Sequence, residues 1–174
     1  MLNAGGSLQA VSLKSGALLW NKTADTGYGF FSGSSACADH GKYAVLFNDG
    51  HFYCWDLNSG NKLWVGELSS WPWGIWGEYG IHSAYGLLIY PQYDGVVARD
   101  WETGKVAWHY KHPMPYPYES PYIDETGQTV YSFRTTCRIA DGVVYTSNTE
   151  HTPSLPLTRG WRLHAINATT GEGI

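Results

Sequence analysis

Three tryptophans close together in the chain are the side chains best suited to hold a flat ligand. Trp71, Trp73 and Trp76 lie in a stretch interrupted by Pro and Gly, which makes it a poor β-strand. Indole rings can stack on a sugar ring or a planar cofactor. The polar anchors beside such a platform would be Glu78, Tyr93 and Asp94. The same rings can instead fill space between neighbouring sheets, and we favour this packing interpretation.

A second candidate site lies nearer the C-terminus. Glu150 and His151, with Arg159 in the same segment, can bind a metal ion or a substrate, although a solvated loop is the interpretation we favour. His109 and His112 are three residues apart, so in a strand they would point to opposite faces and would not chelate a metal. The sequence shows no Ser-His-Asp order, phosphate-binding loop or basic stripe. We therefore predict no catalytic, cofactor-binding or metal-binding residue.

The composition indicates a β protein. Of 174 residues, 15% are charged and 16% aromatic, and 21 are Gly. Disordered chains have few aromatics and much charge, and coiled coils are rich in Ala, Glu, Lys and Leu, so both classes are excluded. The formal net charge of −4 gives no electrostatic reason to expect nucleic acid or an anionic membrane as a partner. No apolar run approaches the ~18 residues of a membrane span.

The three cysteines do not form a disulfide framework. Cys37, Cys54 and Cys137 cannot all pair within one chain, and none lies in a CxxC pattern. We interpret them as small buried apolar residues. Cys37 and Cys54 are expected two strand spacings apart, ~9–10 Å, which is too far for a disulfide.

An internal repeat decides the organisation of the chain. In each copy a Gly follows a small residue by six positions, and a Trp follows that Gly by four. The three gapless copies are Ala10–Gly16–Trp20, Cys54–Gly60–Trp64 and Ala98–Gly104–Trp108. The turn Gly recurs every 44 residues, and a fourth copy contains Ala165 and Gly171. The Trp of that copy would fall at position 175, one residue beyond the sequence.

Each copy has the pattern of a β-hairpin. Residues 52–57 and 62–65 are strand-like, and Gly60 closes the turn between them. A second strand pair, 34–38 and 43–47, precedes them around the turn 39–41. We call the four antiparallel strands A, B, C and D. Units of ~40–50 residues with four strands are the signature of β-propeller blades, and the repeated Trp on strand D can fill the space between blades.

The repeat resembles that of a known family. The segment Ala98-x-Asp100-x-x-Thr103-Gly104-x-x-x-Trp108 is similar to the tryptophan-docking repeat of the quinoprotein-like, pyrroloquinoline-quinone-type β-propellers. The resemblance implies an all-β propeller fold. It does not fix an activity, because such blades occur in quinone-dependent dehydrogenases and in non-enzymatic assembly or cell-surface proteins. Residues 150–160 also look like an insertion seen in secreted archaeal members.

The sequence departs from the catalytic members of that family. Those enzymes hold the quinone between a Trp and a ring of two adjacent cysteines, beside calcium and an Asp base. No two cysteines are adjacent here, and no Asp can be matched to the base. We predict no cofactor, and pyrroloquinoline quinone with calcium only if the full-length protein is a dehydrogenase. The WD40 propellers fit less well, because Trp55-Asp56 is the one Trp-Asp pair in register.

The repeat predicts a single domain that is an incomplete ring of about three and a half blades. The expected blade pieces are residues 1–23, 24–68, 69–112 and 113–174. The expected partners are the remaining blades or a second copy that closes the ring, and beyond these a protein or polysaccharide. Nucleic acid and a membrane span are not expected.

The last blade is longer than the others because of two insertions. They fall in its D-to-A and B-to-C connections, which lie on one face of a propeller, and outward loops on a rigid scaffold are where binding usually resides. Residues 113–118 are either a stiff recognition segment or a wrap around the scaffold, and we favour the latter. The acceptor triplets at Asn21 and Asn167 slightly favour an exported protein. We expect a non-enzymatic binding or scaffold module, located extracellularly, at the cell surface or in the periplasm. The alternatives are a dehydrogenase fragment and a carbohydrate-binding propeller.

Overall fold

The computed structural model confirms an all-β protein built from antiparallel sheets. It describes residues 7–23, 36–46, 51–67, 80–92, 95–111, 122–123, 129–130, 137–151 and 158–174, and none of these is helical. The chain divides into two compact units, Met1–Ser69 and Ser70–Ile174. The boundary between the units lies one residue after the expected junction of the blade pieces 24–68 and 69–112. That the chain is a single domain stays a prediction.

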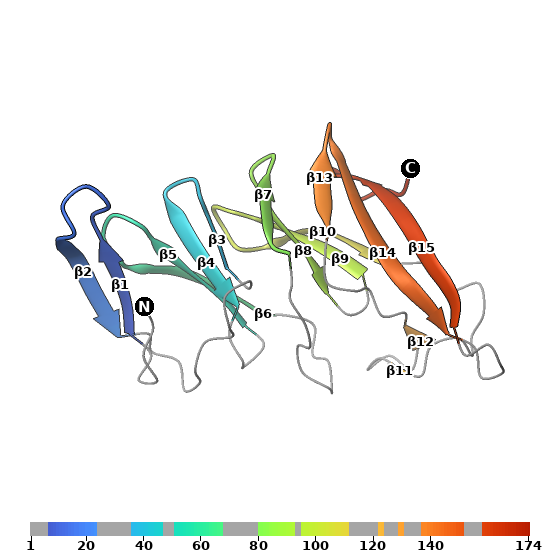
Figure 1. The fold of residues 1–174 in the computed structure, drawn as a ribbon, viewed down its shortest axis with the longest axis horizontal. Helices are drawn as coiled ribbons and strands as arrows, with labels where there is room; N and C mark the ends of the chain where they lie inside the picture. Colours follow the sequence, from blue (N-terminus) through green and yellow to red (C-terminus); the bar gives the residue numbers. More distant parts are fainter. Residues whose placement is uncertain are drawn as a thin grey trace. The chain divides into compact units, whose positions relative to one another are not determined.

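The first unit contains a hairpin and a four-stranded sheet (Figure 1). The hairpin strands are β1 (Ser7–Val11) and β2 (Leu18–Thr23). The sheet runs in chain order through β3 (Ala36–Asp39), β4 (Lys42–Leu46), β5 (His51–Asp56) and β6 (Lys62–Glu67). This order confirms the expected A, B, C and D strands of one blade.

The second unit contains a four-stranded sheet, a three-stranded sheet and a small strand pair. The first sheet consists of β7 (His82–Ala84), β8 (Leu87–Gln92), β9 (Gly95–Asp100) and β10 (Val106–Lys111). The small pair, which the sequence did not predict, is β11 (Tyr122–Ile123) with β12 (Thr129–Val130). The last sheet consists of β13 (Arg138–Ala140), β14 (Val143–His151) and β15 (Thr158–Asn167). A single antiparallel bridge, Ile166 to Gly173, stands where the fourth strand of this sheet would begin.

The turns between strands A and B share one backbone conformation. His40-Gly41, Tyr85-Gly86 and Asp141-Gly142 each have positive φ at both residues, as a type I′ hairpin turn requires. The turn also contacts the C-to-D turn of its own sheet, because the carbonyls of Gly41, Gly86 and Gly142 accept hydrogen bonds from the amides of residues 57, 101 and 168, each the first residue after strand C. Both turns of a sheet therefore lie at the same end.

The turns between strands C and D also repeat. In each, a Gly with φ near 70° donates its amide to the carbonyl four residues earlier, and a polar side chain caps the turn. Asp100 Oδ1 accepts from the amide and hydroxyl of Thr103, both at 2.7 Å, and Asn167 Oδ1 does the same for Thr169 at 3.0 and 2.8 Å. In these turns the capping residue lies two positions after the small residue of the repeat.

The conserved spacing of small residue and Trp produces one cross-strand pairing. Ala10 faces Trp20, Cys54 faces Trp64, and Ala98 faces Trp108 across their hairpins. A register shift follows immediately in all three hairpins. The small side chain leaves room for the indole.

The three cysteines, all within the described residues, form no disulfide, as the sequence indicated. Cys54 and Cys137 are buried, while Cys37 is half-buried. Cys37 pairs with Ala44, which in turn pairs with Cys54, so one strand separates the two cysteines. The Cys137 thiol donates to the carbonyl of Gly80 at 3.4 Å, and burial raises its pKa to about 12.

Candidate functional site

All six residues of the predicted aromatic platform and its polar anchors lie outside the described part of the chain. They are Trp71, Trp73, Trp76, Glu78, Tyr93 and Asp94. Residues 113–118 lie outside it as well. Their role in binding stays a prediction.

The second candidate segment is placed at one end of the β14–β15 pair. Glu150 pairs with Gly160 and His151 with Thr158, so the register shift there leaves Arg159 as the extra residue. The expectation of a loop at Glu150 and His151 is wrong. The insertion lengthens two paired strands to nine and ten residues.

Glu150, His151 and Arg159 lie at the end of their sheet opposite to the A-to-B turn, which is here called the open end. β14 begins after the turn Asp141-Gly142, and its antiparallel pairing with β15 runs away from that turn. The B-to-C connection therefore leaves the sheet opposite to the A-to-B turn. This placement is the one that the sequence assigned to the binding face of the blade.

The repeated tryptophans dock on the turn of the following repeat. In the first unit Trp20 Nε1 donates to the carbonyl of Leu57 at 2.8 Å. A Cβ atom added to Gly60 would lie 2.7 Å from the Trp20 ring, so Gly is required at that position. Leu8, Val45, Tyr53 and Trp55 form the core beside this contact.

The second unit repeats this contact. Trp108 Nε1 donates to the carbonyl of Ala168 at 3.2 Å, and a Cβ on Gly171 would lie 2.7 Å from the Trp108 ring. Trp108 is part of a core that includes Val96, Val144 and Ile166. The structure places Trp20 against Gly60 and Trp108 against Gly171. The docking roles assigned to these residues stay predictions, as do those of Gly16, Trp64 and Gly104.

The second unit also contains buried polar contacts that the sequence analysis missed. Arg99 is buried and donates to the Tyr90 hydroxyl and to the carbonyl of Gly104, both at 2.8 Å. Between β10 and β15, the Tyr110 hydroxyl lies 3.3 Å from Nδ1 of the buried His164. The sequence offered one sign of these contacts: Arg99 lies within the otherwise mainly apolar strand Gly95–Asp100, where a charged side chain needs hydrogen-bond partners.

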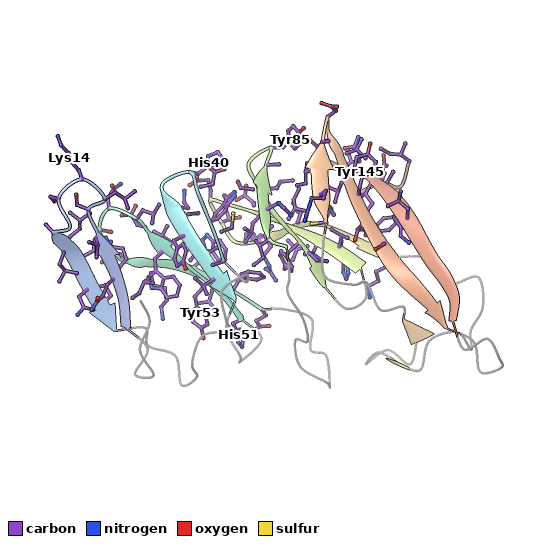
Figure 2. The ribbon with its side chains drawn as sticks, in the orientation of Figure 1. Lys14, His40, His51, Tyr53, Tyr85 and Tyr145 are labelled. Atoms are coloured by element: carbon purple, nitrogen blue, oxygen red, sulfur yellow. The ribbon has the colours of Figure 1, made fainter. Side chains whose placement is uncertain are left out.

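A further contact joins two A-to-B turns in the second unit. The Tyr85 hydroxyl accepts a hydrogen bond of 2.8 Å from the Gly142 amide. Tyr85 lies at the tip of the β7–β8 turn (Figure 2), and its φ of 55° is unusual for a bulky residue. The bond holds adjacent blades together at their turn ends.

The described residues do not fit a quinone–calcium centre. No group of three or more His, Cys, Asp or Glu side chains among them is placed to bind a metal ion. The three cysteines lie on separate strands or beside one, and the raised pKa keeps the Cys137 thiol neutral. We therefore derive no chemical step through such a centre. Within the same described residues no helix is long and apolar enough to cross a membrane.

Comparison with known proteins identifies the family. The sequence profile of the family described as outer membrane protein assembly factor BamB matches residues 4–172. The chain belongs to this family. It is a pyrroloquinoline-quinone-type β-propeller repeat protein, as the docking repeat indicated. No curated protein matches the chain.

Solved structures of BamB-type and quinone-enzyme propellers share the fold. BamB from Moraxella catarrhalis aligns with a TM-score of 0.63 and 18% identity, over 98% of this chain and 57% of that one. Quinohemoprotein alcohol dehydrogenase ADHIIG from Pseudomonas putida HK5 aligns with a TM-score of 0.65 and 16% identity, over 99% and 31%. The enzyme from Comamonas testosteroni gives a TM-score of 0.62 at 14% identity, over 99% and 32%.

The chain spans from about a third to just over half the length of these relatives. At such identities the likeness shows the fold, and the fold is shared by an assembly factor and by quinone enzymes. The archaeal resemblance of residues 150–160 stays a prediction. Family membership and fold therefore do not fix the activity of this chain.

Proposed function

We propose that this chain is part of a non-enzymatic binding or scaffold module of an exported propeller. Its partner would be a protein or a polysaccharide, and its location extracellular, at the cell surface or periplasmic. Further blades, supplied by a longer protein, would complete the ring. The family description, which names an assembly factor, supports a protein partner.

One observation carries this proposal. The last sheet has β14 and β15 strands of nine and ten residues, while the corresponding β8 and β9 have six each. The extra length projects from the open end of the sheet and carries a carboxylate, an imidazole and a guanidinium at Glu150, His151 and Arg159. A paired extension whose sequence carries both acidic and basic residues is suited to bind a polar partner surface.

Site-specific photo-crosslinking in the native host tests this proposal. A photoreactive residue at position 151 or 159 should capture a partner that the same probe at position 14 or 40 does not. Lys14 and His40 are matched controls because they are exposed at turn tips, as Figure 2 shows. Equal capture from both ends, or none from 151 and 159, would contradict the proposed binding face.

The dehydrogenase alternative makes a different prediction. A fragment of a quinone enzyme requires that the full-length protein bind pyrroloquinoline quinone in a calcium-dependent manner. Calorimetric titration with both compounds measures this directly. Tight calcium-dependent binding would replace the scaffold proposal by the enzymatic one.

The carbohydrate alternative rests on the tryptophan cluster. Stacking by Trp71, Trp73 and Trp76 would give a glycan-array response that the Trp73→Ala substitution abolishes. No response, or one unaffected by the substitution, would remove this alternative.

A further inference from the structure

Two triplets of the chain have the N-glycosylation acceptor pattern, and the structure places them in different surroundings. They are Asn21-Lys22-Thr23 in β2 and Asn167-Ala168-Thr169, which begins at the last residue of β15. The attached sugar is bulky, so a modified Asn must lie on the surface of the folded protein. The surroundings of each Asn therefore decide which triplet can carry a glycan.

The Asn167 triplet is part of the docking contact of the second unit. Asn167 Oδ1 accepts hydrogen bonds of 3.0 and 2.8 Å from the amide and the hydroxyl of Thr169. The middle residue, Ala168, is fully buried. Its amide donates to the Gly142 carbonyl, and its carbonyl accepts from Trp108 Nε1. A glycan on Asn167 would lie beside the turn on which the indole docks and would compete with that contact.

The Asn21 triplet lies on an outer strand. β2 corresponds to strand D of the repeat, and among the described residues it pairs with β1 alone. The Asn21 side chain is exposed. Asn21 and Trp20 are consecutive residues of a strand, so their side chains point to opposite faces. A glycan on Asn21 would therefore leave the docking contact of Trp20 undisturbed.

The exposure of this position does not depend on whether another repeat precedes it. Val65 has the same position in β6, one residue after the repeated Trp. Its sheet does receive a preceding repeat, because Trp20 of the hairpin docks on its turn at Gly60. Val65 is nevertheless 46% exposed. A blade that precedes the first hairpin would thus leave Asn21 accessible.

We propose that Asn21 is an N-glycosylation site of this protein and that Asn167 is not. The inference rests on the proposed export, because the sugar donor is an oligosaccharide linked to a lipid phosphate. Asn21 Nδ2 attacks the anomeric carbon of the donor, and a C–N bond replaces the C–O bond to the phosphate. The amide nitrogen loses one proton, and the lipid phosphate is the leaving group.

A glycan at this position would protect an exposed sheet edge. Such edges can pair with strands of other chains, and proteins limit this by covering or charging them. Leu18 and Leu19 of β2 are 57% and 63% exposed, and Leu63, which corresponds to Leu19, is 45% exposed in β6. A sugar on Asn21 would shield the apolar edge of β2 from such pairing.

Peptide mass spectrometry of the full-length protein tests the inference. The protein is directed by an added export signal into the secretory pathway of a eukaryotic cell. The peptide that contains Asn21 should carry a glycan, and peptide N-glycosidase should remove it and convert this Asn to Asp. Asn21→Gln and Thr23→Ala should each abolish the mass shift, whereas Thr23→Ser, which keeps a hydroxyl, should retain it.

Asn167 is the matched control in the same digest, and its peptide should be unmodified in the folded, secreted protein. Enzymatic removal of the glycan should leave the circular dichroism spectrum unchanged. An unmodified Asn21, or equal glycan occupancy at Asn21 and Asn167, would overturn the inference. Because the export signal is supplied, this result is independent of export from the native host. Cell fractionation of that host tests the proposed location separately.

Discussion

The indole nitrogen of Trp108 donates a hydrogen bond to the carbonyl oxygen of Ala168, 60 positions further along the chain. Trp20 makes the same bond to Leu57 across 37 positions. Although insertions lengthen the later repeat, the contact between strand D and the following turn is unchanged. The docking contact, rather than the length of chain between its partners, is the constant element of this fold.

The turn glycines provide a matched test of this contact. Gly171→Ala places a Cβ 2.7 Å from the Trp108 ring at a φ of 77°, so both overlap and backbone strain oppose folding. Gly16→Ala has a similar φ of 72° but open space around its Cβ. We expect Gly16→Ala to cost about 1 kcal/mol of unfolding free energy and Gly171→Ala about 2–4 kcal/mol. Urea denaturation measures both, and equal losses would contradict docking at Gly171.

The two parts of the Trp108 interaction can be separated by substitution. Trp108→Ala removes a buried ring and should destabilise its unit by about 3–5 kcal/mol. Trp108→Phe keeps an aromatic ring but leaves the Ala168 carbonyl without this donor, and should cost less, about 1–3 kcal/mol. Thermal unfolding followed by circular dichroism shows whether Trp108→Ala is less stable than Trp108→Phe. Equal stability of the two variants would mean that the hydrogen bond, rather than the ring, provides the stabilisation.

The turn caps predict which substitutions the chain tolerates. Asp100 accepts two hydrogen bonds from Thr103, and Asn167 likewise accepts two from Thr169 and one from the Thr170 amide. Asp100→Asn should therefore leave the free energy of unfolding nearly unchanged. Asp100→Ala should lower it by about 1 kcal/mol, as loss of a comparable helix cap does. Chemical denaturation of the two variants side by side provides the measurement, and a destabilised Asn variant would show that charge, rather than geometry, matters.

The Cys137 thiol predicts a loss of stability in alkali. Its pKa is raised to about 12 by burial, from a usual value of 9.0. The folded state thus holds its proton where the unfolded state releases it, so this contribution is complete below pH 9 and declines between pH 9 and 12. At pH 10 the loss should be about 1.4 kcal/mol relative to neutral pH.

Comparison with Cys137→Ala isolates that effect. Tyr43 and Tyr110 also have pKa values raised by burial, so they lower stability in alkali in the same direction. Urea unfolding at pH 8 and pH 10 should show a smaller decline for the alanine variant than for the wild type. Parallel declines would mean that ionisation of Cys137 contributes nothing.

The sequence predicted the repeat fold well because its signals are local and recur. The spacing of Ala98, Gly104 and Trp108 specifies a hairpin, a turn and a cross-strand pair at once, and each is found. The extension of β14 was missed because Thr149, Glu150 and His151 have no hydrophobic alternation, and their pairing with residues 158–161 is visible only in the sheet. The hydrogen bond between the Gly142 amide and the Tyr85 hydroxyl joins residues 57 positions apart, and no short sequence motif predicts such a contact.

The direction of docking has a consequence for synthesis on the ribosome. Because Trp20 and Trp108 each dock on a turn made later, a finished hairpin keeps its indole uncovered until its successor leaves the exit tunnel. That interval is 37 residues in the first unit and 60 in the second. During the longer interval the Trp108 indole stays uncovered for more of translation, so a chaperone that binds exposed apolar side chains would act mainly at this stage.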